Sequence, residues 1–155
     1  MNRLALITAA FAGLTVLTVA PAGAASTEQS ATSTSTATVT SCGSTGLQAA
    51  LATRVCAGIT GNSVEFYGTV SLAGPPSPGS PAPAPKDLIT SVTSEIVGSG
   101  SPDTRNSRVI FTATTIKVPG ATTTVPCGST IRGTFAVASF PWTANPVVHE
   151  VTISC

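Results

Sequence analysis

Charged side chains are scarce in this sequence. Lys, Arg, Asp and Glu account for 8% of the 155 residues, whereas ordinary soluble domains contain roughly 25%. The two signs almost balance, with a formal net charge of +1, and the basic residues form no cluster. Nucleic acids and anionic membranes are bound through clustered cations, so we expect neither as a partner. Hydroxyl and backbone groups must solvate much of the surface in place of ions.

Residues that carry enzymatic chemistry are equally rare. His149 is the only histidine, and no serine lies in a Gly-x-Ser-x-Gly elbow, the turn that exposes many catalytic serines. His149 falls on the apolar side of its expected strand, so we interpret it as structural. Paired carboxylates could serve a glycosidase, but Glu65, Glu95 and Glu150 occupy outward strand positions, where carboxylates are usually solvated. We therefore expect no enzymatic activity.

Signatures of bound cofactors and metals are also missing. No two cysteines have the Cys-x-x-Cys spacing that is common in zinc and redox sites. The sequence contains no glycine-rich phosphate loop, no calcium loop and no N-glycosylation sequon. We therefore predict that the protein carries neither a cofactor nor a metal ion.

One hydrophobic run is long, and it lies at the start of the chain. Residues 4–20 are apolar or small, Met1–Arg3 precede them as a short basic segment, and Pro21–Ala25 supply small residues. This pattern is typical of a secretory signal peptide, here cleaved after Ala25. No later run approaches the ~20 residues that span a bilayer. We expect a secreted, extracellular protein with no integral membrane span, and its Thr-, Ala- and Pro-rich, Lys-poor composition is typical of bacterial exported proteins.

The cysteines form an even set in a chain that we expect to be exported. This pattern predicts two disulfide bonds, for which four cysteines allow three connectivities. We prefer Cys42–Cys56 and Cys127–Cys155, because each pair closes a short loop. The second pair would pin the last strand, since chain ends fray unless they are tied down.

After the signal peptide, the sequence predicts one domain made of strands. Residues 26–37 are a flexible Ser/Thr-rich leader, and residues 38–155 are long enough for a single domain. Alternating or β-branched segments predict seven strands, at residues 36–41, 64–72, 88–97, 108–118, 122–125, 130–140 and 147–154. We predict an all-β fold, an antiparallel immunoglobulin-like β-sandwich with two disulfides, with a β-barrel as the alternative.

Several local features interrupt these strands. A short helical turn is expected at Leu47–Leu51, a turn at Pro119–Gly120 and a bulge at Gly133. The proline-rich segment 74–85 predicts an exposed, polyproline-like connection, either a functional loop of the sandwich or a spacer. Charged residues gather around one expected turn, where they either pair locally or mark a polar rim: Asp103, Arg105 and Arg108.

The candidate binding residues follow from these loops. Trp142 lies between two prolines in a loop that also holds Asn145, Tyr67 falls on the polar face of its strand, and Arg105 borders the turn. Trp142 either folds back over the end of the sandwich or contacts a partner. Sandwiches commonly bind through loops at one end, and the candidate loops here are 74–87, 98–106 and 141–146.

These features predict a secreted, non-enzymatic binding module for an unknown protein, glycan or small-molecule ligand. The main alternative is a secreted protease inhibitor, whose bait residue would be Lys86 or Arg54. A small hydrolase that uses His149 and a small-ligand carrier are further alternatives, the latter on fold analogy alone.

Overall fold

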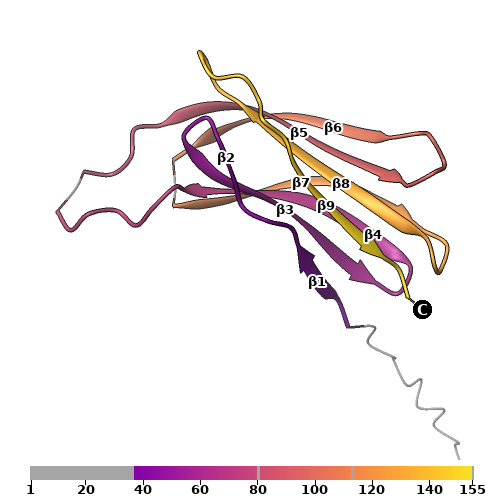
Figure 1. Cartoon of the computed structure of the whole chain (residues 1–155). Helices are drawn as coiled ribbons and strands as arrows, with labels where there is room; N and C mark the ends of the chain where they lie inside the picture. Colours follow the sequence, from indigo (N-terminus) through magenta and orange to yellow (C-terminus); the bar gives the residue numbers. More distant parts are fainter. Residues whose placement is uncertain (1–36, 80, 113, 155) are drawn as a thin grey trace, which may run out of the picture. The chain divides into compact units, whose positions relative to one another are not determined.

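The computed structural model describes residues 37–79, 81–112 and 114–154, which contain strands and no helix. The strands are β1 (Val39–Cys42), β2 (Gly46–Gln48), β3 (Leu51–Thr60), β4 (Ser63–Leu72), β5 (Lys86–Ile96), β6 (Asp103–Phe111), β7 (Thr115–Thr124), β8 (Thr130–Ala138) and β9 (Val147–Thr152). They form two antiparallel sheets (Figure 1). One sheet has the order β1-β3-β4-β7, with β2 also paired to β3, and the other has the order β6-β5-β8-β9. The predicted all-β sandwich of antiparallel sheets is confirmed, whereas the signal peptide and nearly all of the leader lie outside the described residues.

The core lies between the two sheets because each central strand alternates between buried and outward side chains. On β4, Val64, Phe66 and Val70 are buried, and on β8 Ile131, Phe135 and Val137 are buried. This is the period-two pattern of a strand with one covered face. The side chains from the two inner faces form one hydrophobic cluster.

Two phenylalanines interlock with two glycines at the centre of the core. A Cβ atom built on Gly133 of β8 would lie 2.2 Å from the ring of Phe66 on β4. A Cβ atom on Gly68 of β4 would lie 2.3 Å from the ring of Phe135 on β8. Each ring therefore occupies the space that a side chain on the facing strand would need. Gly133 stands in regular register with Ser94 and His149, so the bulge predicted there is wrong.

The helical turn expected at Leu47–Leu51 is also wrong. β2 and β3 form a hairpin joined by Ala49 and Ala50, whose φ angles are 51° and 60°. Two successive residues with positive φ suit the tight turns that connect antiparallel strands. Leu51 is buried at the start of β3, and burial of alternate β3 side chains outweighs the modest helix propensity of the Leu and Ala residues here.

The region between residues 108 and 125 differs from the prediction in its boundaries. The expected strand 108–118 is divided between β6 and β7, and the expected turn Pro119–Gly120 lies inside β7. β7 is an edge strand, where proline removes no ladder hydrogen bond to a neighbour. A Cβ atom on Gly120 would lie 2.4 Å from the Phe66 carbonyl oxygen, next to the register shift between Glu65 and Tyr67. The bulge of this domain therefore lies between β4 and β7.

Gln48 links the two sheets through its buried side-chain amide. Its Nε2 donates to the Phe135 carbonyl oxygen at 3.1 Å, and its Oε1 accepts from the Val137 backbone N–H at 2.9 Å. β9 pairs with β8 only as far as Phe135. The amide of Gln48 thus continues the hydrogen bonding of β8 beyond the end of β9, and Thr53 Oγ1 accepts from the same Nε2 at 2.8 Å.

A disulfide bond joins Cys42 of β1 to Cys56 of β3, as predicted. The two residues are direct register partners, so the bond fastens the short edge strand β1 to the sheet. The predicted partner of Cys127 is Cys155, which lies outside the described residues, so that pairing stays a prediction.

Replacing both Cys42 and Cys56 by serine is expected to lower the free energy of unfolding by about 3 kcal/mol, the chain-entropy value for a loop of this length. Urea unfolding followed by circular dichroism measures the change. The conservative control is Ser44→Ala, in the connection between β1 and β2, with an expected effect below about 0.5 kcal/mol. A double cysteine variant as stable as the wild type would contradict the prediction.

Candidate functional site

Two long uncharged connections lie at the same end of the sandwich, which we call the proline end. The registers Leu51↔Leu72 and Ile89↔Ala138 place the β4–β5 connection and the β8–β9 connection there. Both connections extend from this end in Figure 1. The third expected loop, 98–106, is shorter than predicted because β6 already begins at Asp103. It lies at the opposite end of the sandwich. The structure therefore brings two of the three candidate loops together.

The β8–β9 connection presents two aromatic side chains to solvent. Ser139 and Trp142 form a β-bridge through two backbone hydrogen bonds, with the cis-linked Phe140–Pro141 pair at its tip. Phe140 is 99% exposed and Trp142 is 57% exposed. More than half of the Trp142 side chain is therefore in water, and its role as a contact residue stays a prediction.

Apolar side chains on the outer face of β5 and β6 continue this aromatic tip. Ile89 and Ile110 are each 64% exposed. An open hollow of ≈350 Å³ lies between Phe140 and Ile89, bordered by Ser139 and residues 85–87. A neighbouring hollow of ≈410 Å³ is lined by Pro85, Asp87, Arg108 and Ile110. The proline end thus carries an apolar surface that extends from the loop tip along two strands.

Two of the charged side chains at this surface, Asp87 and Arg108, form an ion pair. The Arg108 guanidinium donates to the Asp87 carboxylate, with Nε–Oδ distances of 2.9 and 3.0 Å. This hydrogen bond lowers the pKa of Asp87 and raises the pKa of Arg108, so both groups stay charged at neutral pH. Lys86 Nζ donates to the Ala49 carbonyl oxygen. Arg108 does not pair with a charge of its own turn, because it reaches across to Asp87 of β5.

The four predicted binding residues do not form one site. Trp142 and Asn145 share the β8–β9 connection, where both are exposed, but Tyr67 lies on the outer face of the other sheet. The Lys117 ammonium sits 3.9 Å from the centre of the Tyr67 ring, a cation–π contact within that sheet. Arg105 is exposed on the edge strand β6. It lies near the Asp103 end of this strand, whereas the Phe111 end of the strand lies at the proline end.

Three residues of this surface are not among the predicted binding residues: Phe140, Ile89 and Ile110. Phe140 follows β8 (Thr130–Ala138) at an even position, on the side of the alternation opposite to the buried Phe135. The alternation of β8 was the signal that could have identified it. Ile89 and Ile110 are likewise on the outward side of their strands.

The candidate catalytic residues have structural partners. His149 Nε2 lies 2.9 Å from Ser41 Oγ, a contact that links β9 to β1. Within the described residues, no carboxylate is hydrogen-bonded to His149, so the group that orients the base of a catalytic triad is not seen there. Glu95 and Glu150 both bind Arg132, with N–O distances of 2.9 and 2.7 Å. These carboxylates neutralise a cation on the outer face of three adjacent strands.

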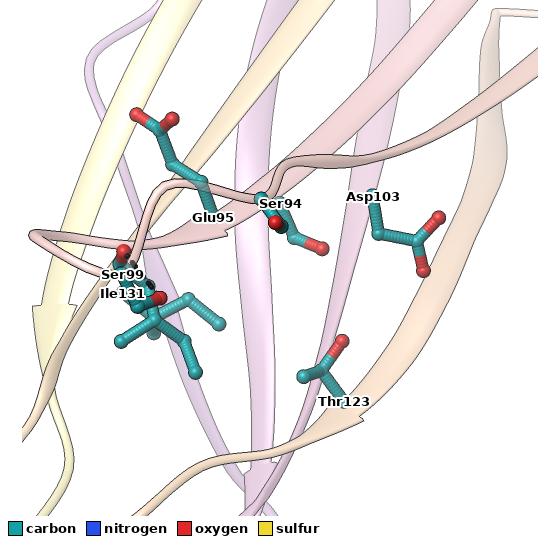
Figure 2. A pocket seen from close by; sticks show the side chains of 8 residues that line it. Ser94, Glu95, Ser99, Asp103, Thr123 and Ile131 are labelled. Atoms are coloured by element: carbon teal, nitrogen blue, oxygen red, sulfur yellow. Dashed lines mark hydrogen bonds between the residues drawn. The ribbon is translucent and has the colours of Figure 1, made fainter.

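A small hollow of ≈70 Å³, lined by both polar and apolar side chains, opens at the opposite end of the sandwich. Figure 2 shows the Glu95 carboxylate turned away from Asp103 and Thr123, which line the other side of the hollow. A water molecule takes about 30 Å³ of liquid volume, so the hollow has room for a few waters. Across the described ranges, no group of three or more His, Cys, Asp or Glu side chains could hold a metal ion.

Comparison with protein-family models, with curated proteins and with solved structures finds no match to this chain. Among the residues that the structure describes, no helix has the length and apolar character needed to cross a bilayer.

Proposed function

We propose that this protein is a secreted, non-enzymatic binding module that engages its partner through the proline end of an immunoglobulin-like, doubly disulfide-bonded sandwich. The observation that carries the proposal is the 99% exposure of Phe140 at the tip of a turn closed by the Ser139–Trp142 bridge. Moving a large apolar side chain out of water lowers the free energy, so an exposed phenylalanine favours association with a partner that covers it. Exposed aromatics of this kind dominate binding energy in many interfaces.

The geometry of the tip also limits the entropic cost of binding. The bridge between Ser139 and Trp142 holds the turn, so little chain freedom is lost when a partner covers it. The neighbouring hollows provide room for apolar groups of the partner next to Ile89 and Ile110. Because Arg108 and Asp87 neutralise each other, the surface fits an uncharged, partly apolar ligand surface.

The same geometry does not favour the inhibitor alternative. A bait residue must project from an exposed loop into a protease cleft. The Lys86 ammonium is instead bonded to the Ala49 carbonyl, and Arg54 lies within β3, paired in register with Thr69 of β4. Neither cation lies at the tip of a loop.

Substitution of Phe140 tests the proposal. A randomised, surface-displayed peptide library and a panel of soluble glycans serve as probes. Binders of the wild-type protein are expected to lose at least about 30-fold in affinity for Phe140→Ser, which corresponds to the loss of a hot spot of about 2 kcal/mol. Trp142 is the only tryptophan, so its fluorescence reports the binding.

Two controls accompany this measurement. The free energy of unfolding of Phe140→Ser is expected to lie within about 0.5 kcal/mol of the wild-type value, because the side chain is in water. Val148→Ser, at an exposed position of β9, is expected to leave the affinity unchanged. If every recovered probe binds the Phe140 variant as tightly as the wild type, the proline end is not the binding site.

A further inference from the structure

The two sheets have four edges, and three of them are blocked in ways that prevent another strand from adding. β7 carries Pro119 within the strand and a register shift against β4. β1 and β2 are short. The edge of β9 is covered by β1, whose Ser41 contacts His149 of β9. Proline, irregularity, shortness and coverage are the usual protections of exposed strands.

The fourth edge, β6, has none of these four protections. Its inward-facing charges, Asp103 and Arg105, restrict the sequence of a strand that can add there. β6 spans nine residues without proline or glycine, and its register with β5 is continuous from Phe111 to Asp103. It lies at the margin of its sheet in Figure 1, next to β5. A long, regular and unpaired edge offers a row of backbone donors and acceptors to an incoming strand.

Two hydrogen bonds identify which backbone groups face the free side of β6. The Ser107 carbonyl accepts from Thr90 Oγ1 of β5 at 3.0 Å, so it faces β5. The Val137 N–H donates to Gln48 and therefore points away from β5. Thr90 is the register partner of Val137, so the backbone N–H and C=O of Thr90 point away from β8 and toward its other partner, Ser107 of β6. Because these directions alternate along an antiparallel strand, the N–H and C=O groups of Asn106, Arg108 and Ile110 point outward from the sheet.

Two hollows on the outer face border β6 between Asn106 and Ile110, and Arg108 lines both of them. One is lined by Arg108 and Ile110 of β6 together with Pro85 and Asp87. The other, of ≈350 Å³, is lined by Asn106, Ser107 and Arg108 of β6 together with Ile89 of β5. The side chains of a paired strand that face the same side recur every second residue. In strand addition, such pockets provide specificity and the backbone bonds provide affinity.

Charges on the inward row of β6 select the partner. Asp103 and Arg105 follow the same alternation as the buried Phe111, and both are exposed. Neither takes part in an ion pair among the described residues. A strand added beside them would bring one residue next to each charge. A carboxylate opposite Arg105 and a cation opposite Asp103 would satisfy both.

We propose that β6 is a strand-addition site for an extended peptide segment of another protein. The segment pairs antiparallel to β6, with an apolar residue opposite Ile110, an acidic residue opposite Arg105 and a basic residue opposite Asp103. A second copy of this chain fits less well. Two β6 strands centred on Ser107 would set Asp103 opposite Phe111 and Arg105 opposite the other copy's Val109, leaving both inward charges uncompensated.

The test uses a synthetic peptide of the length of β6, Thr-Ile-Thr-Thr-Thr-Val-Glu-Thr-Lys, and a matched peptide in which Glu and Lys are exchanged. We expect the wild-type protein to bind the first peptide about 10-fold more tightly, equivalent to about 1.4 kcal/mol. The double variant Asp103→Arg/Arg105→Asp is expected to reverse this preference. Amide hydrogen exchange followed by NMR is expected to show new protection at Asn106, Arg108 and Ile110.

Further measurements separate this proposal from the others. Methylating the first peptide at the amides opposite Arg108 and Asn106 is expected to abolish binding, because those N–H groups bond to β6. Phe140→Ser is expected to leave peptide binding unchanged, because Phe140 lines neither hollow beside β6. The aromatic tip of the proline end and the β6 edge can therefore fail independently, although both surfaces include the hollow at Arg108 and Ile110. Equal affinity for the two peptides, protection at β7 or β9 instead, or a dimer through β6 in sedimentation velocity would each overturn the proposal.

Discussion

Phe66→Ala is expected to lower the free energy of unfolding by about 3–5 kcal/mol, the usual cost of removing a buried phenylalanine ring. The Phe66 side chain is completely buried, and its ring fills the space above Gly133 on the facing sheet. The surroundings cannot fill the cavity, because Gly133 has no side chain and the backbones of β4 and β8 are held in place by their hydrogen bonds to neighbouring strands. Urea unfolding followed by circular dichroism measures the loss, with Tyr67→Ala on the outward side of β4 as the less costly control.

A double-mutant cycle tests the interlocking itself. Gly133→Ala alone is expected to cost about 1–3 kcal/mol, the usual penalty of overpacking, because its Cβ atom would meet the Phe66 ring. In combination with Phe66→Leu, the cost of the alanine is expected to fall, since the shorter side chain leaves room. Additive costs in the double variant would show that the ring and Gly133 do not compete for the same space.

The fold class could be predicted because strands with one buried face leave a period-two pattern. The alternation around Phe66 and Val70 predicted β4 almost to its bounds, and the alternation of Val147, His149 and Val151 predicted β9. β3 was missed because the segment from Leu51 contains residues with modest helix propensity, and its alternation is masked by small side chains. Which residues pair across the sandwich depends on contacts far apart in sequence, and local patterns carry little information on them.

The candidate site could be predicted only in part. The segments 74–87 and 141–146 could be predicted as loops, because proline and turn residues mark connections locally. Whether Trp142 folds back over the sandwich or contacts a partner could not be decided from the sequence. The position of Ile89 next to Phe140, and of Ile110 opposite Asp87, depends on the pairing of β5 with β6 and β8, which the sequence does not encode locally. Tyr67 failed as a member of the site for the same reason, since its outward face belongs to the other sheet.

Gln48→Leu is expected to lower the free energy of unfolding by about 4 kcal/mol. Leucine has a similar volume but cannot pair with the backbone of β8, so the Phe135 carbonyl and the Val137 N–H lose their partner. Each buried backbone group left without a hydrogen bond costs about 1–3 kcal/mol. Gln48 is only 2% exposed, so water does not readily replace the lost bonds. Hydrogen exchange of the Val137 amide is expected to accelerate more than that of the β4 core amides.

Leu47→Ala is the matched control, because Leu47 is the preceding residue of β2 and is 64% exposed. Its expected effect is below about 0.5 kcal/mol. Gln48→Glu keeps an acceptor for the Val137 N–H, but its carboxylate has no donor for the Phe135 carbonyl. At low pH the carboxyl is protonated and can donate. The loss in free energy of unfolding is therefore expected to be smaller at low pH than at neutral pH. If Gln48→Leu were as stable as the wild type, the amide would not be needed to complete the ladder. The end of β8 would then be held by packing around Phe135 alone.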